Sequence, residues 1–230
     1  MKTMEAAERP SMAMNEKDMW LAVLLSAQPW LVLAGTFLIG YLCGSVPFGY
    51  LYGRLAGVGD IRTIGSGNIG ATNVLRTGRK GLAALTLLSD AAKGFVPVLL
   101  CRQYLGFEPA LFAAAGAFLG HLYPVWLRFR GGKGVATYIG VITALYWGAG
   151  AFFCAVWLCI ALATRYSSLS ALIAAALTPI FVAVQTAGAL SVFILALSAF
   201  LIAKHHKNIR NLISGHETKI GQSAPGAKSA

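Results

Sequence analysis

The chain has 230 residues, of which 57% are hydrophobic and only 12% are charged, and its formal net charge at pH 7 is +11. Soluble domains carry about 25% charged residues, so this composition indicates a polytopic membrane protein. Nucleic acid is excluded as the reason for the positive charge, because most Lys and Arg residues fall in short loops between apolar runs, where they set topology. The eight acidic residues are too few for paired-carboxylate catalysis, and no metal or cofactor is expected.

Residues 1–29 are predicted to form a polar N-terminal extension, and residues 221–230 a disordered tail. Seven apolar runs lie between them, and each approaches the ~20 residues that cross a bilayer. The runs cover 30–55, 80–104, 109–127, 133–147, 149–164, 168–186 and 188–204. The sequence therefore predicts an all-α fold, a membrane bundle of seven transmembrane helices over residues 30–220.

Small residues and prolines predict how these helices pack. Glycines recur every four residues in the first run, at Gly40 and Gly44, and again in the third, at Gly116 and Gly120. This G-x-x-x-G spacing favours close contact between helix backbones. Prolines at positions 47, 97, 124 and 179 are expected to kink or end their helices.

The distribution of Lys and Arg predicts the orientation. Basic residues follow the first, third, fifth and seventh runs, whereas the loops on the other side hold only Arg102. The positive-inside rule then places the N-terminus on the periplasmic side and the C-terminus in the cytoplasm. All glycine-rich basic stretches fall on the cytoplasmic face.

The first cytoplasmic loop reads SGNIGATNVLR over residues 66–76. It offers a hydroxyl, two amides and the guanidinium of Arg76, which can bind a phosphate through two hydrogen bonds. Alone, the stretch is better interpreted as a capped amphipathic turn on the membrane surface.

The second run contains Asp90 and Lys93, which share a helix face and can pair. Ionisable groups at this depth are candidates for a functional site. The favoured interpretation is a buried ion pair that fixes packing.

The stretch FRGGKGVAT over residues 129–137 surrounds Lys133 with three glycines. Glycines allow a tight turn whose N–H groups converge on an anion, and a helix starting near Val135 adds its positive end. It is not a Walker A loop, because Gly134 stands where that motif has Ser or Thr. A flexible inter-helix turn is the equally weighted alternative.

The C-terminal stretch reads HHKNIRNLI over residues 205–213. His205 and Asn208 lie on one helix face and are expected to point the same way. The alternative is a basic interfacial helix that meets anionic lipid. His121, near the end of the third run, is interpreted as a hydrogen-bonded structural histidine.

Three cationic, amide-rich stretches thus meet on one face of a membrane bundle. This pattern predicts a site for one or two phosphates beside the acyl region of the bilayer, and so an enzyme that joins a polar phosphate compound to a fatty chain. A phosphate transporter is the main alternative, but only Asp90 and Lys93 lie deep in the membrane and no paired repeats with broken helices are evident. A non-catalytic lipid-binding protein would explain the basic face alone.

In this order and topology the three motifs resemble those of the acyl-phosphate-dependent glycerol-3-phosphate acyltransferases, the PlsY family. The first motif is SGNIGATN, which begins at residue 66 and is followed by the arginine at 76. The second comprises Gly120-His121, the proline at 124 and FRGGKGVAT over residues 129–137. The third comprises H-x-x-N-I, which begins at residue 205, and G-x-E-x-K, which ends at residue 219. The resemblance covers about residues 30–220, and the N-terminal extension departs from it.

The resemblance implies acyl transfer from acyl phosphate to the 1-hydroxyl of glycerol 3-phosphate, which gives 1-acylglycerol 3-phosphate and phosphate, the first acylation of phospholipid synthesis. It implies a monomer in the cell inner membrane, in contact with membrane lipids. The His-x-x-x-x-Asp motif of other acyltransferases is absent from the sequence, in line with a donor other than acyl-CoA.

The expected site follows from the motifs. His205 or a substrate phosphate takes the hydroxyl proton, and the sequence leaves that choice open. The expected catalytic residues are Ser66, Arg76, Lys133, His205 and Asn208. The expected substrate-binding residues are Gly67, Asn68, Asn73, Gly131, Gly132, Gly134, Thr137, Ser170 and Glu217, of which Ser170 is placed only approximately.

Overall fold

The computed structural model describes residues 15 and 19 and the ranges 28–186 and 188–222. The predicted N-terminal extension lies mostly outside these residues, and so does the predicted tail from residue 223 on. By its contacts the chain divides into two units, 1–32 and 33–230. In the first unit the Met19 N–H donates to the Asn15 carbonyl at 3.0 Å. Apart from the first four residues of α2, the features below belong to the second unit.

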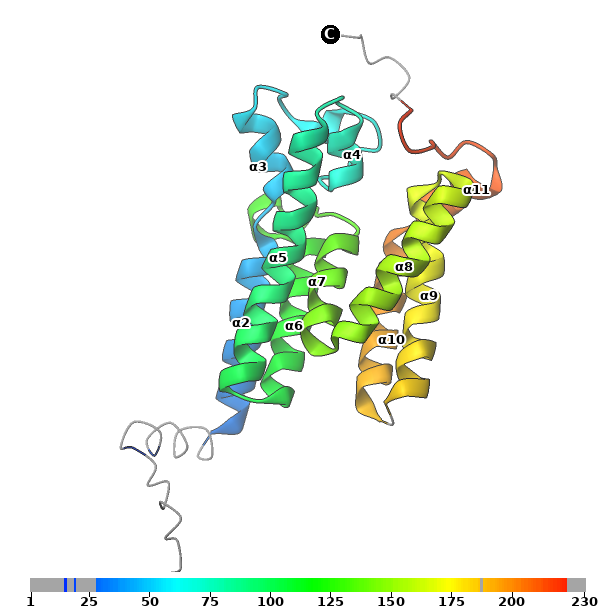
Figure 1. The fold of residues 1–230 in the computed structure, drawn as a ribbon. Helices are drawn as coiled ribbons and strands as arrows, with labels where there is room; N and C mark the ends of the chain where they lie inside the picture. The colour runs from blue at the N-terminus through cyan, green and yellow to red at the C-terminus, as the bar shows by residue number, and fades with distance from the viewer. Residues whose placement is uncertain (1–14, 16–18, 20–27, 187, 223–230) are drawn as a thin grey trace, which may run out of the picture. The chain divides into compact units, whose positions relative to one another are not determined.

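All regular structure in the described residues is helical, which confirms the predicted all-α class (Figure 1). Two 3-10 turns, η1 (Ile61–Thr63) and η2 (Val125–Leu127), accompany the α-helices. The α-helices are α2 (Pro29–Ser45), α3 (Phe48–Leu55), α4 (Ala71–Leu75), α5 (Lys80–Tyr104), α6 (Phe107–Leu122), α7 (Val135–Leu145), α8 (Trp147–Thr164), α9 (Ser167–Gln185), α10 (Ala189–Lys204) and α11 (His206–Ile213).

Each of the seven predicted apolar runs coincides with a helix or a helix pair, although their lengths differ. Five segments are long and apolar enough to cross a membrane, and α10 with α11, bent by 60°, makes a sixth. Helix α7 is apolar but has only 11 residues. The helices are consistent with seven spans, and that number stays a prediction.

Proline and glycine act on the helices as predicted at two places. Pro47 separates α2 from α3, so the first predicted run is two helices. A Cβ atom on Gly44 would collide with the backbone of Ala117 in α6, and one on Gly116 with the backbone of Phe37 in α2. The G-x-x-x-G spacing therefore lets α2 and α6 pack backbone to backbone.

Figure 1 shows α5, α6 and α7 side by side, with α8, α9 and α10 standing together next to them. Aromatic side chains join the two groups, because the Tyr138 ring on α7 lies 6.0 Å from that of Phe118 and 5.3 Å from that of Phe153. The Tyr138 hydroxyl also shares a 2.7 Å hydrogen bond with Ser198 Oγ on α10.

Two cations, buried Lys93 and exposed Arg102, donate to backbone carbonyls at the ends of short or broken helices. Lys93 Nζ lies 2.7 Å from Asp90 Oδ1 and donates at 2.6 Å to the Val46 carbonyl, at the break between α2 and α3. The predicted pair is thus present, and it ties α5 to that break. Arg102 donates from Nη1 to the Ala144 and Leu145 carbonyls at 2.9 and 2.5 Å, which satisfies the end of α7.

Candidate active site

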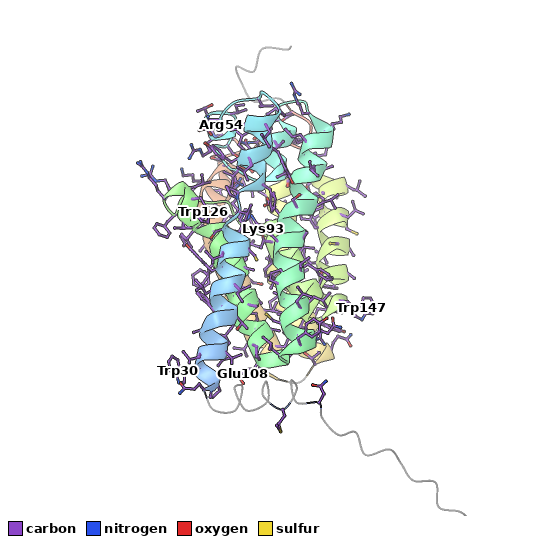
Figure 2. All side chains as sticks on the ribbon, turned by 90° about the vertical axis from the view of Figure 1, so that its left-hand side faces the viewer. Trp30, Arg54, Lys93, Glu108, Trp126 and Trp147 are labelled. Carbon is purple, nitrogen blue, oxygen red and sulfur yellow. The ribbon has the colours of Figure 1, made fainter. Side chains whose placement is uncertain are left out.

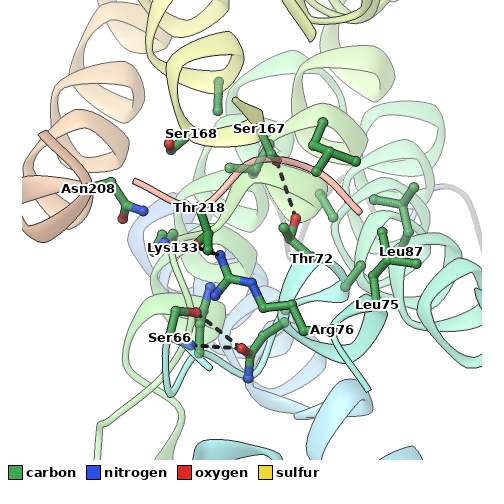
Figure 3. Close-up of a pocket in the computed structure, with 18 of the residues that line it drawn as sticks. Ser66, Thr72, Leu75, Arg76, Leu87, Lys133, Ser167, Ser168, Asn208 and Thr218 are labelled. Carbon is green, nitrogen blue, oxygen red and sulfur yellow. Dashed lines mark hydrogen bonds between the residues drawn. The ribbon is translucent and has the colours of Figure 1, made fainter. Parts of the chain in front are cut away.

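A cavity of about 730 Å³ opens among α4, α5, α7, α8, α9 and the C-terminal segment (Figure 3). Its walls include all five residues predicted to be catalytic, although 142 positions of sequence separate the first from the last. Those residues are Ser66, Arg76, Lys133, His205 and Asn208. Asn68, Asn73, Gly134 and Glu217 from the predicted binding set also line it.

The loop before α4 is held by the side chain of Asn73. Asn73 Oδ1 accepts hydrogen bonds from the Ser66 N–H at 3.0 Å and from Ser66 Oγ at 3.3 Å, and its Nδ2 donates to the Ile61 carbonyl at 2.8 Å. Gly67 has a φ of 70°, a conformation that glycine adopts without strain. Asn73 and Gly67 therefore fix the loop that presents Ser66.

Arg76 stands at the end of α4 and crosses the cavity toward the C-terminal segment. Its Nη2 donates to Thr218 Oγ1 at 2.7 Å, as the dashed line in Figure 3 marks. Burial lowers the pKa of the Arg76 guanidinium, and the nearby Glu217 carboxylate opposes that change. Because arginine stays charged in proteins, the cavity keeps a fixed cation with a planar set of donors.

Lys133 supplies a second cation. Burial lowers the pKa of its ammonium group to about 8, with Glu217 raising the value and Arg76 lowering it. The pKa stays above neutrality, so the side chain is mainly charged at pH 7. A phosphate that enters the cavity would raise the pKa of Lys133 and so favour its charged form.

The glycines before Lys133 have a structural role that the sequence did not predict. The Gly131 and Gly132 N–H groups donate to the Leu122 and His121 carbonyls at 3.2 and 3.1 Å, so they are not free to converge on an anion. A Cβ atom on Gly131 would meet the His121 carbonyl, and one on Gly132 the His121 ring. Both positions need glycine because the loop lies directly on α6, and their contact with substrate stays a prediction.

The predicted helix start is confirmed, since α7 begins at Val135 after Gly134 with a φ of 87°. Gly134, Val135 and Ala136 all line the cavity. The first N–H groups of a helix have no partner within it and carry partial positive charge. The backbone N–H groups that remain available to an anion are therefore at the start of α7, whereas those of Gly131 and Gly132 are already bonded to α6.

Thr137 and Ser170, both predicted to bind substrate, do not line the cavity. Thr137 Oγ1 donates to the Asp90 carbonyl at 2.9 Å, and Ser170 Oγ donates to the Tyr166 carbonyl at 2.8 Å. Their roles toward substrate stay predictions. The serines that line the cavity are their neighbours Ser167 and Ser168, which sequence reasoning missed.

The C-terminal motif is organised around Glu217. Its Oε1 accepts hydrogen bonds of 2.6 Å from Asn208 Nδ2 and from Ser168 Oγ. The carboxylate thus joins α11 to the start of α9 and sets the orientation of the Asn208 amide. Its negative charge also lies close enough to raise the pKa of Lys133.

His205 sits at the bend between α10 and α11, and only 2% of it is exposed. Its Nδ1 lies 2.8 Å from the Leu201 carbonyl, which can only accept, so Nδ1 carries the proton and Nε2 is left as an acceptor. Burial lowers the pKa of the imidazole to about 4. His205 is therefore neutral at pH 7 with an available lone pair, as a hydroxyl-orienting group or base requires.

The other end of the cavity is apolar. Leu87 on α5, Ile139 on α7 and Trp157 on α8 line it. This end lies along the membrane-spanning helices, whereas the cations stand at the end that carries α4. Polar and apolar parts of one amphiphilic substrate can thus occupy a single cavity.

A C-terminal segment, Thr218 to Gln222, lines the cavity as well and was not predicted to do so. The Ile220 N–H donates to the Arg165 carbonyl at 2.7 Å, and Arg165 Nη2 donates back to the Ile220 carbonyl at 3.1 Å. The segment is thereby held against the α8–α9 turn.

Within the described residues, no group of three or more His, Cys, Asp or Glu side chains could hold a metal ion.

Comparison with known proteins agrees with this arrangement. The family model described as "Glycerol-3-phosphate acyltransferase" matches residues 34–215. The chain belongs to the glycerol-3-phosphate acyltransferase family. A member from Methylorubrum populi is 56% identical over 86% of this chain and 98% of its own length, and one from Rhodopseudomonas palustris is 54% identical over 83% and 97%.

A solved family structure, PlsY, described as an integral membrane glycerol 3-phosphate acyltransferase in its glycerol 3-phosphate form, shares the fold with a TM-score of 0.78 and 36% identity. The match covers 82% of this chain and 96% of the solved chain. A second structure of PlsY, in a lysophosphatidic acid form, has a TM-score of 0.75 and 35% identity. These acyltransferases place this chain among multi-pass membrane proteins, as predicted.

Proposed function

We propose that this acyltransferase moves an acyl group from acyl phosphate to the 1-hydroxyl of glycerol 3-phosphate, releasing 1-acylglycerol 3-phosphate and phosphate. The observation that carries the proposal is one cavity that joins two cations, Arg76 and Lys133, to a neutral His205 and an apolar end. Both substrates carry a phosphate, and the donor also carries a fatty chain.

In the proposed reaction the 1-hydroxyl oxygen attacks the acyl carbonyl carbon, and the bond from that carbon to the phosphate oxygen breaks. The electron pair leaves with the phosphate, where Lys133 and the start of α7 offset the charge. The hydroxyl proton passes to His205 Nε2, or to a substrate phosphate while His205 only orients the hydroxyl. Phosphate is a good leaving group, so catalysis needs mainly positioning and charge stabilisation.

Glycerol 3-phosphate is proposed to bind through Arg76, Lys133 and Ser66, with Asn208 beside its hydroxyl groups. A guanidinium suits this task because its planar donors match two phosphate oxygens at once. Glu217 holds Asn208 in place and is proposed to act through that contact.

Acyl phosphate as the donor is the finer part of the proposal. It is supported by the absence of the His-x-x-x-x-Asp motif from the sequence. The test is turnover by purified protein in detergent, with acyl phosphate and acyl-CoA compared at equal chain length. Turnover with acyl phosphate alone supports the proposal, and turnover with acyl-CoA alone contradicts the donor.

The same assay tests the transporter alternative. A transporter shows no chemistry in detergent, whereas an enzyme does not need a sealed vesicle. The chain is further proposed to act as a monomer in the cell inner membrane, with its cavity mouth on the cytoplasmic side. That orientation rests on the Lys and Arg distribution.

A further inference from the structure

An open apolar groove of about 470 Å³ lies on α2, α6 and the loop that follows α6. It shares no lining residue with the active-site cavity. Leu38, one of its walls, is 55% exposed, so the groove faces what surrounds the membrane-spanning helices. The lining residues are Phe37, Leu38, Tyr41, Leu119, Tyr123 and Phe129.

The loop at the end of this groove is held in an unusual conformation. Tyr41 Oη donates to the Tyr123 carbonyl at 2.8 Å, which fixes the loop to α2. Arg128 and Phe129 then have φ values of 52° and 60°, in the left-handed region that side chains other than glycine rarely adopt. Phe129 lies in the groove wall, and Trp126, three residues earlier in the same loop, is 62% exposed (Figure 2).

Two guanidinium groups flank Phe129 along the chain. Arg128 and Arg130 are exposed, and neither side chain has a hydrogen bond or ion pair within the described part of the chain. Three of the four described acidic side chains are bonded to other groups, and the fourth stands near the opposite end of the helices (Figure 2). They are Asp60, Asp90, Glu217 and Glu108. The groove thus ends in positive charge that the protein itself does not neutralise.

We propose that this groove binds one anionic phospholipid of the surrounding bilayer. One acyl chain lies in the groove, and the headgroup phosphate accepts hydrogen bonds from Arg128 and Arg130. Exposed tryptophan is enriched where headgroups meet hydrocarbon, so Trp126 marks the level at which the headgroup sits. A free phosphate would leave the apolar groove unused, and a zwitterionic lipid would bring its own cation against the two arginines.

Lipid binding here bears on the active site through one short connection. Arg130 directly precedes Gly131, and Lys133 follows two residues later. A lipid that holds Arg128 and Arg130 restrains the start of the loop that carries Lys133. The binding site itself does not depend on the proposed reaction, so its test needs no substrate.

The test is native mass spectrometry of purified protein released from detergent with phosphatidylglycerol or phosphatidylcholine of equal chain length. We expect one phosphatidylglycerol molecule to stay bound at collision energies that remove phosphatidylcholine. Arg128→Gln with Arg130→Gln is expected to weaken phosphatidylglycerol binding about thirtyfold, since each of the two arginines contributes to anionic-lipid attraction. The control is Arg54→Gln with Arg79→Gln, which removes the same charge from two other exposed arginines and should keep binding.

A second pair of variants tests the groove rather than the charge. Leu38 and Ile39 are each 55% exposed on α2, but only Leu38 lines the groove. Leu38→Trp should fill the groove and displace the lipid, whereas Ile39→Trp should leave binding unchanged. Equal retention of both lipids, unchanged binding in the double arginine variant, or equal loss in the two tryptophan variants would each overturn the proposal.

Discussion

Asn208 Nδ2 donates a 2.6 Å hydrogen bond to Glu217 Oε1, and the same oxygen accepts a second bond from Ser168. This contact joins three segments at the cavity wall. It explains how a carboxylate can occur in a site proposed to bind anions, since the carboxylate orients an amide instead of facing the phosphate. Hydrogen bonds to charged groups contribute roughly 1.5–3 kcal/mol.

Glu217→Ala should therefore lower kcat/KM for glycerol 3-phosphate by about ten- to a hundredfold, because the Asn208 amide loses its fixed orientation. Glu217→Gln keeps an acceptor oxygen and should lose less. Steady-state kinetics of both variants checks this. The role would be wrong if Glu217→Ala matched the wild type, or if both variants lost activity only because they no longer fold, which thermal melting reports.

The pH dependence of kcat/KM should report Lys133. Its lowered pKa of about 8 means that the free enzyme loses this charge as pH rises through that value, so kcat/KM should fall on the alkaline side. Removing the Glu217 charge with Glu217→Gln removes a factor that raises the Lys133 pKa, and the fall should move to lower pH. A profile that is flat to pH 9.5, corrected for spontaneous hydrolysis of acyl phosphate, would contradict this assignment.

His205 should not change its protonation state between pH 6 and 8, since burial lowers its pKa to about 4. If it accepts the hydroxyl proton, His205→Ala should lower kcat by about 10²–10⁴-fold. If it only orients the acceptor, the loss should appear mainly in the KM for glycerol 3-phosphate. Wild-type kinetics for both substrates in this variant would remove His205 from the site.

Gly132→Ala should damage stability and donor use together. The new methyl group would meet the His121 ring, and overpacking in a buried place costs about 1–3 kcal/mol. Gly81→Ala is the matched control, because a Cβ atom there meets nothing within 4 Å and alanine favours the helix it lies in. Equal melting temperatures and equal KM values for acyl phosphate in the two variants would argue against the close approach.

The orientation can be checked by cysteine labelling in intact cells, on a background without the four native cysteines. Glu108→Cys should react with an impermeant reagent from outside, whereas Arg79→Cys should react only after permeabilisation, because Lys and Arg concentrate on its side. Both positions are exposed. The reverse pattern would invert the membrane orientation.

Much of the fold could be predicted because the length of each apolar run can be seen in the sequence, and because proline and glycine interrupt helices within a few residues of their own position. Pro47 was expected to interrupt the first run, and the helix after Gly134 was expected to start near Val135; both predictions are confirmed. The 60° bend at His205 was not foreseen. No proline or glycine marks it, and it depends on contacts between α11 and the rest of the site.

The site was predicted as a set of residues but not as a geometry. The motifs named all five residues that meet in the cavity, because each stretch carries its chemistry within a short window. Long-range contacts determine the geometry of the site. For example, the N–H groups of Gly131 and Gly132 donate to carbonyl groups of α6. Likewise, helical phase placed Ser168 in the cavity and turned Ser170 away. Such choices depend on segments far apart in sequence.

The most direct measurement is ³¹P NMR of purified enzyme with acyl phosphate and glycerol 3-phosphate, for wild type and Arg76→Lys. We expect 1-acylglycerol 3-phosphate and phosphate to appear in equal amounts. Arg76→Lys, which keeps the charge but loses the planar set of donors, should form both products about 10²-fold more slowly, as loss of 2.7 kcal/mol or so of charge-stabilising contact implies. The control Arg79→Lys should match the wild type. Phosphate release without the acylated product, or an Arg76→Lys enzyme with wild-type rates, would contradict the account.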